Sequence, residues 1–220
     1  MLRVSTSRRY RLPFVKNHTS EVSNVGLLKT GPCRVARVRA MPASPSIISV
    51  LIGIAIDEGL IESVDVSISE FFPDISEDKA SITIEHLLTM RTGIEWLEDP
   101  PRLDSVEGMF ASENWVEFVL NQEQHVRPGG LWRYNFGVPH LLSAIIQEAS
   151  GMTASEFATD RIFNPLGITS AEWHSDPQGV TMGGVGLLMS PRDLLKIGQL
   201  YLNGGEWEGR QIISEEWVNM

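Results

Sequence analysis

The chain has a single cysteine, Cys33, among its 220 residues, which excludes an internal disulfide and a cysteine-built metal site. It has no run of 18 apolar residues, so no transmembrane helix is expected. Basic residues are scarce after residue 41, where nine Lys+Arg face 27 Asp+Glu. An acidic surface repels a phosphate backbone, so this part is not expected to bind nucleic acid.

Metal-ligand spacing and nucleotide loops are absent too. His86, His125, His140 and His174 are dispersed without a pattern such as His-x-x-x-His, so packing or surface positions are expected for them. No GxGxxG or Walker pattern occurs. We therefore expect neither a metal nor a cofactor.

Residues 1–41 have the opposite charge, with nine Lys+Arg and one acid, Glu21, and they show no sustained helical or strand period. They lack the apolar core and cleavage site of a secretory signal, although their Arg/Ser bias would suit an organellar transit peptide, the weaker alternative. The cytoplasm is the default expectation for a chain whose localisation is otherwise unassigned. We predict an unmatched basic segment over 1–45, disordered or translated out of frame, and one partial domain over 46–220.

Regular structure is predicted from Ser46 onward. The stretch SIISVLIGIAIDEG, residues 46–59, is apolar on all sides and too short to span a bilayer, which indicates a buried central helix. Gly59 supplies the left-handed residue that ends such a helix. Further helices are predicted over 84–90 with Thr83 as N-cap, and over 191–201 with Ser190 as N-cap. Others are expected over 115–122, 140–149 and 153–162.

Several segments, in order and spacing, resemble the β-lactamase-related serine hydrolases, the class C β-lactamase-like and penicillin-binding-protein-like family with esterase and nylon-oligomer hydrolase relatives. They are SIISVLIGIAIDEGLI, ITIEHLLTMRTGI, WRYNFGVPHLLSAIIQEASGMTASEF, IFNPLGI, GGVGLLMSPRDLLKIGQLYLNGG and WEGRQIISEEWV, about four-fifths of the chain. The resemblance implies an α+β fold of the β-lactamase/transpeptidase type. Here it would comprise mainly the helical region, with an incomplete antiparallel sheet.

The family's chemistry needs three side chains: a serine and a lysine in the motif Ser-x-x-Lys, and a tyrosine in a second motif. A third motif, Lys-Thr-Gly or His-x-Gly, lies on a strand near the C-terminus and lines the cleft. By resemblance, Tyr134 in WRYNFG is the second-motif tyrosine, although Phe136 stands where the stricter pattern has Asn or Ser. The alternative is that Tyr134 is an ordinary half-buried aromatic.

The nucleophile motif is absent. Aligned on SIISVLIG, the family's serine falls on Pro42 and its lysine on Pro45, and neither proline has a nucleophilic or basic group. Ser44 and Ser46 lack a lysine three residues on and are expected to be helix caps. The chain also ends at Met220, before the third motif would arrive, so it resembles a truncated member.

Two short patterns match by chance. Ser76-Glu77-Asp78-Lys79 spells Ser-x-x-Lys but is expected in an acidic surface loop. Lys29-Thr30-Gly31 spells the third motif but lies in the patternless N-terminal region. Trp96, Trp132 and Trp173 are expected either to line a cleft or to anchor the core. Gly183, Gly184 and Gly186 resemble the family's glycine-rich strand beside the cleft.

A two-base deletion would explain the unusual start. Codons for Ser-Val-Thr-Lys-Ser-Ile that lose one AG encode Ala-Ser-Pro-Ser-Ile, which is residues 43–47 here. The hypothesis is that residues 1 to about 45 are out-of-frame translation, and the DNA sequence across codon 46 tests it.

The predicted function is therefore a serine hydrolase of amides, lactams or esters by resemblance, inactive as written because the nucleophile, the lysine and the last motif are missing. The alternatives are a non-catalytic pseudo-hydrolase that binds a small amide, ester or lactam ligand, and an enzyme with a displaced nucleophile such as Ser46. The substrate and the oligomeric state are left open. An incomplete sheet is expected to expose the apolar faces of residues 47–56 and 141–146.

Overall fold

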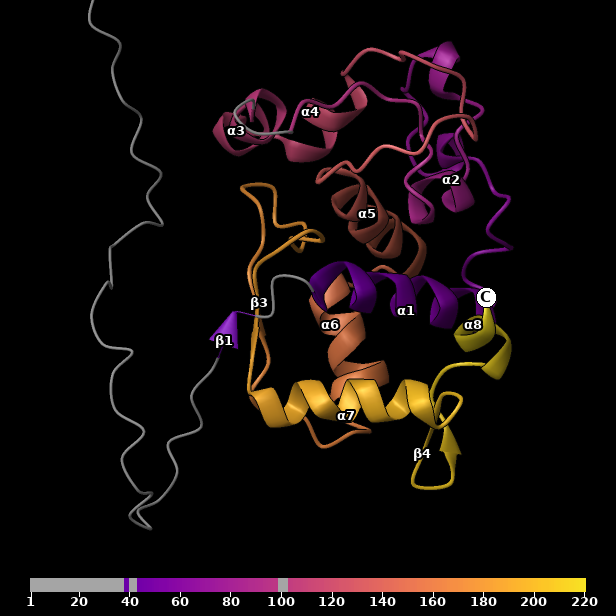
Figure 1. Ribbon diagram of the computed structural model, residues 1–220, viewed down its shortest axis with the longest axis vertical. Helices are drawn as coiled ribbons and strands as arrows, with labels where there is room; N and C mark the ends of the chain where they lie inside the picture. The colour runs from indigo at the N-terminus through magenta and orange to yellow at the C-terminus, as the bar shows by residue number, and fades with distance from the viewer. Residues whose placement is uncertain (1–37, 40–42, 99–102) are drawn as a thin grey trace, which may run out of the picture. The chain divides into compact units, whose positions relative to one another are not determined.

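The computed structural model describes residues 38–39, 43–98 and 103–220, which are mainly helical (Figure 1). The helices are α1 (Ser44–Asp57), α2 (Ile84–Leu88), α3 (Asp104–Ala111), α4 (Trp115–Leu120), α5 (Val138–Ser150), α6 (Ala154–Ala158), α7 (Pro191–Leu202) and α8 (Glu215–Asn219). Short helical turns are η2 (Ile68–Glu70), η3 (Glu77–Lys79) and the π-helical η4 (Thr159–Phe163). The strands are β1 (Val38–Arg39), β2 (Glu172–Trp173), β3 (Leu187–Met189), β4 (Glu206–Trp207) and β5 (Arg210–Gln211). None of the helices described is both long and apolar enough for a membrane crossing.

Most of the basic segment 1–45 lies outside the described residues, so its predicted character and its boundary at residue 45 stay predictions. Two pieces of it are described. Val38–Arg39 forms β1, and Ser44 and Pro45 open α1. The central helix thus begins two residues before the expected start at Ser46. Pro45 fits there because the first turn of a helix leaves its backbone N–H groups unbonded.

Helix α1 is the buried central helix that its sequence predicts. Its side chains are covered nearly all round: Ile47, Ile48, Val50, Leu51, Ile52, Ile54 and Ala55 are buried. Gly59, with φ of 71°, adopts the left-handed conformation expected of it. The backbone N–H of Gly59 bonds to Ile56 O, and that of Leu60 to Ala55 O, which satisfies carbonyls at the end of the helix.

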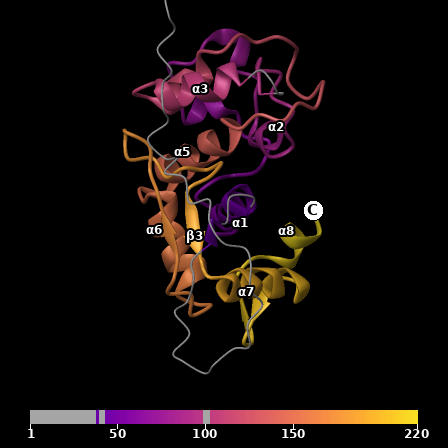
Figure 2. The ribbon, with the colours of Figure 1, turned by 60° about the vertical axis from the view of Figure 1, so that its left-hand side comes forward.

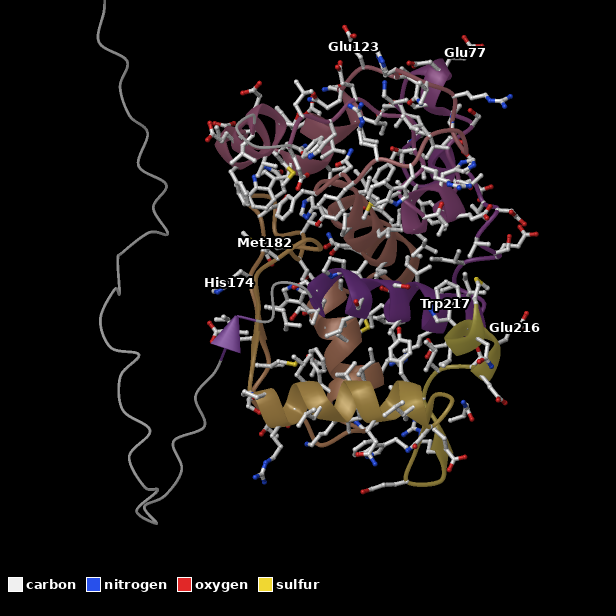
Figure 3. The ribbon with its side chains drawn as sticks, in the orientation of Figure 1. Glu77, Glu123, His174, Met182, Glu216 and Trp217 are labelled. Atoms are coloured by element: carbon white, nitrogen blue, oxygen red, sulfur yellow. The ribbon has the colours of Figure 1, made fainter. Side chains whose placement is uncertain are left out.

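The expected exposure of apolar faces on residues 47–56 and 141–146 is wrong. Apart from half-buried Ile56 and Ser49, these residues are buried, because other helices of the chain supply the cover. Helix α1 packs against α5 and α6, and in the view of Figure 1 α5 lies above it and α7 below it. Figure 2 shows the same order of α5, α1 and α7 after a turn about the vertical axis. The indole of Trp217 on α8 closes over Gly53, where the absence of a side chain leaves room for it (Figure 3).

Capping residues set the starts of other helices as predicted. The Thr83 hydroxyl accepts from His86 N at 3.4 Å, and His86 Nδ1 accepts from Thr83 N at 3.1 Å, which makes a reciprocal capping box. Ser190 caps α7 by accepting from Asp193 N at 3.1 Å. The helix expected over 153–162 is two elements, α6 and the wider turn η4.

The sheet in the described residues is small and antiparallel. Strand β3 is central, with β1 on one side and β2 on the other; Val38 pairs with Met189 and Trp173 with Leu187. Strands β4 and β5 form a separate hairpin. Because β1 leads toward α1, the pairing of β1 with β3 places the N-terminal end of α1 beside the sheet (Figure 1).

We predict that Gly53→Ala lowers the thermal unfolding midpoint. A Cβ at position 53 would lie 2.5 Å from Trp217 Cδ2, so the rigid indole would have to leave α1. Gly198→Ala is the matched control, since no atom lies within 4 Å of its added Cβ in α7. That control should gain about 0.5–1 kcal/mol from helix propensity alone. Circular dichroism melts measure both, and equal midpoints would contradict the packing of Trp217 on α1.

Candidate functional site

Tyr134 lies in the loop before α5, and its ring is partly exposed, with 41% of the residue's surface accessible. Backbone and side-chain bonds fix this loop. Arg133 N donates to Met90 O at 3.0 Å, and Phe136 N donates to Glu98 Oε2 at 2.9 Å. Glu98 Oε2 also accepts from Trp96 Nε1. The loop is therefore held from both sides of Tyr134, while no described residue hydrogen-bonds to the tyrosine hydroxyl itself.

The electrostatic surroundings keep Tyr134 protonated. Partial burial, followed by the negative charge of Glu98, raises the pKa of the phenol above its ordinary value of 10.0. At neutral pH fewer than about one phenol in a thousand is ionised. Tyr134 can thus donate a hydrogen bond to a ligand, and it is poorly suited to remove a proton.

The two residues after Tyr134, Asn135 and Phe136, take part in the local turn and in aromatic packing. Asn135 is buried, and its Oδ1 accepts from Gly137 N at 2.8 Å in a turn that leads into α5. Phe136 stands where the stricter family pattern has an amide or a hydroxyl. Its ring lies 5.7 Å from that of Phe110, centroid to centroid. The Phe136 ring offers no polar group where the motif would supply one, and Asn135 keeps an unpartnered but buried Nδ2.

A glycine segment approaches the same loop. A Cβ on Gly183 would lie 1.8 Å from Pro139 O, and one on Gly184 would lie 2.9 Å from Phe136 O. Only glycine permits this contact between the segment and the start of α5. The segment continues into β3, next to β1. The fold therefore places the glycine segment against residues 136–140, just after Tyr134.

Two serines, Ser44 and Ser46, lie at the start of α1, and no described lysine lies beside them to act as a base. Ser44 is fully buried and its Oγ has no hydrogen-bond partner among the described residues, whereas Ser46 is exposed. Neither caps the helix, which starts without a side-chain cap. Pro42, where the family's serine aligns, lies outside the described residues.

Both lysines of the described residues are engaged elsewhere. Lys79 Nζ lies 3.1 Å from Ser76 Oγ and 3.6 Å from Asp78. Lys196 Nζ donates to Gly167 O at 2.7 Å and lies 3.0 Å from Asp193. No described lysine is thus left to serve the start of α1 as a base.

The Ser76–Lys79 pattern differs from its expected surroundings. Ser76 is exposed as predicted for a surface loop, but Lys79 is buried. Its Nζ donates to Ser76 Oγ and lies 3.6 Å from Asp78, in a short turn at the surface and away from the start of α1. Lys29-Thr30-Gly31 lies outside the described residues. Of the three tryptophans considered for a cleft, Trp96 and Trp173 are core residues and Trp132 is exposed.

A fully buried histidine–aspartate pair lies near the start of α5. His140 Nε2 lies 3.1 Å from Asp176 Oδ2, and both side chains are inaccessible. Burial opposes ionisation of Asp176, but hydrogen bonds from His140 and from Val180 N and Gln178 N hold its pKa below the ordinary 3.8. This pair ties α5 to the loop before the glycine segment. The sequence gives no sign of it, since the partners are 36 residues apart.

No three His, Cys, Asp or Glu side chains among the described residues come together to hold a metal ion. His140 is buried, as expected of a packing residue, but it also bonds to Asp176, and half-buried His86 caps α2.

Comparison with known proteins gives one family and one fold. The family model described as Beta-lactamase matches residues 43–220. A search of curated proteins finds no match. Three solved structures are similar: a protein described as a 6-aminohexanoate-dimer hydrolase from Bacillus anthracis (20% identity, TM-score 0.69), an octameric penicillin-binding protein homologue from Pyrococcus abyssi (23%, 0.67), and D-amino acid amidase from Ochrobactrum anthropi (18%, 0.66).

These matches cover 80%, 84% and 84% of this chain, but 50%, 48% and 58% of the respective structures. The chain therefore spans about half the length of the solved structures that it matches. The α+β fold of the β-lactamase/transpeptidase type is confirmed, with the helical region predominant and the antiparallel sheet small.

We predict that Asp176→Asn destabilises the fold by about 1–3 kcal/mol at pH 7, because the buried His140 loses its charged partner. The folded pKa of Asp176 is depressed, so its carboxylate stabilises the fold above the unfolded pKa and ceases to do so as pH falls through the folded pKa. The difference in unfolding free energy between the unsubstituted chain and Asp176→Asn should therefore shrink below about pH 4. Urea unfolding across pH measures it, with the exposed Asp65→Asn as control; a difference that grows toward acid would refute the assignment.

Proposed function

This chain belongs to the Beta-lactamase family, and from that premise we propose that it binds a small amide, ester or lactam compound without forming an acyl-serine. The family chemistry is acyl transfer through a serine. In this chain the scaffold and the candidate tyrosine Tyr134 are retained, whereas prolines stand at the positions that align with the serine and the lysine.

The observation that carries the proposal is that none of the described residues supplies a base at the start of α1. Pro45 occupies the position of the family's lysine, and the two described lysines are engaged with other partners. A serine hydroxyl is a weak nucleophile until a neighbouring base removes its proton. Without that base, neither buried Ser44 nor exposed Ser46 is activated.

Tyr134 supports a binding role. Its hydroxyl is protonated at neutral pH and has no partner among the described residues, so it can donate to a carbonyl or carboxylate oxygen. Trp132, which is exposed on the same loop, offers an apolar face close to it in sequence. The proposal is that the phenol donates to the carbonyl or carboxylate oxygen and that the indole packs against the apolar part of the compound.

Labelling with a fluorophosphonate, which reacts with activated serines, tests whether the chain can form an acyl-serine. Intact-protein mass spectrometry after incubation with a fluorophosphonate should show no adduct on the unsubstituted chain. The Pro42→Ser/Pro45→Lys variant, which restores serine and base, is expected to gain one. Pro42→Ser/Pro45→Ala is the matched control and should remain unlabelled.

Two outcomes would contradict the proposal. One is an adduct on the unsubstituted chain that vanishes in Ser46→Ala, which would identify the displaced nucleophile. The other is labelling of the control variant at the rate of the restored one, since the missing lysine would then not be the cause.

Binding is tested separately with Tyr134→Phe. Isothermal titration with benzylpenicillin should show binding to the unsubstituted chain that becomes about threefold to tenfold weaker when the phenol's hydrogen bond is removed. Tyr201→Phe is the matched control, because Tyr201 is a half-buried tyrosine on α7. Equal losses in both variants would argue that Tyr134 contributes nothing specific.

A further inference from the structure

A second concave surface lies between residues 71–79 and 114–124, and none of its residues belongs to the Tyr134 loop. Its volume is about 980 Å³. The apolar part of the lining is Phe71, Phe72, Ile75, Val116 and Leu120, and all five are half-buried. We call this surface the η3–α4 groove. Its volume lies near the upper end of the range for small-molecule sites, about 300–1,000 Å³.

The groove is lined by acidic side chains that have no ion-pair partner among the described residues. Asp74, Glu117 and Glu123 line it, are exposed, and form no ion pair with any described residue. Figure 3 shows Glu123 at the outer surface of the end of the domain that also carries Glu77. Three unpaired carboxylates beside apolar surface attract a cation that also brings apolar groups.

The one cation in the lining does not offset them. Lys79 is buried, and its Nζ is held by Ser76 Oγ at 3.1 Å and by Asp78 at 3.6 Å. The pKa of Asp78 is lowered, first by the hydrogen bond from Ser76 and also by the charge of Lys79, so this carboxylate stays ionised beside the ammonium group. The pair is internally neutralised, which leaves the groove with its three free negative charges.

One acceptor in the wall of the groove has no partner. Gln124 lines the groove, and its Nε2 donates to Thr92 O at 2.8 Å and to Val126 O at 2.6 Å. Its buried Oε1 accepts no hydrogen bond from the described residues. An N–H donor such as that of lysine or arginine suits this oxygen.

We propose that the η3–α4 groove binds an extended basic peptide segment in which lysine or arginine alternates with apolar residues. The apolar side chains lie on Phe71, Ile75 and Val116, and the cationic ones reach the carboxylates along the edge. Alternation suits the groove because successive side chains of an extended peptide point to opposite faces. The partner is thus a basic segment of another protein.

Fluorescence anisotropy with a labelled peptide of sequence KLKFRLK tests the proposal on the full chain. Binding is expected, and it should weaken as salt is added. The neutral analogue QLQFQLQ should bind much more weakly. In Glu117→Gln/Glu123→Gln the dissociation constant should rise about tenfold. Glu62→Gln/Glu216→Gln removes the same charge from exposed positions outside the groove and should change it less than twofold.

The contribution of the apolar groove residues to peptide binding is tested with Val116→Ser. Val116→Ser should weaken binding while the charges stay in place, and its melting curve shows whether the fold is kept. Equal losses in the two glutamate variants would overturn the proposal, because the peptide would then be attracted by the net charge alone. The absence of peptide binding would also overturn the proposal. A third contrary result would be sedimentation data in which the groove variants dissociate an oligomer of the unliganded chain, because a second copy of the chain would then occupy the groove.

Discussion

Burial of the apolar surface of α1 is the interaction on which the rest of the described structure depends. Helix α1, with its isoleucines, leucine and single valine, packs against α5 and α6, and Trp217 covers the one position where a side chain is missing. At roughly 25 cal/mol per Å² of buried apolar area, such a helix supplies much of the hydrophobic stabilisation of a small domain. Because α1 is fixed in the core, its N-terminal end has a fixed place beside β3.

The second constraint is the close approach of the glycine segment to α5. Gly183 meets Pro139 with no space for a side chain, and the His140–Asp176 pair holds the preceding loop to the same helix. These contacts involve none of the groups that would react with a substrate. The geometry of the site can therefore persist without the chemistry, which agrees with the separation of fold and function in enzyme families.

Local signals in the sequence predict what neighbouring residues decide. The apolar run before Gly59 predicts α1, and Thr83 and Ser190 predict the starts of their helices. Contacts between distant residues leave no such signal. The cover that Trp217 gives α1 depends on a glycine 164 positions earlier, and the burial of Lys79 depends on how its loop folds back. The exposure expected for α1 was wrong for that reason.

Phe136 has a consequence for which side chains its position accepts. Its ring packs toward Phe110 and against Gly184, in a place where the stricter family pattern has Asn or Ser. An asparagine at this position would remove aromatic contact and bring a polar group next to these rings, at a cost in folding stability. The tyrosine motif and the packing of the neighbouring aromatic rings therefore make opposite demands on one side chain.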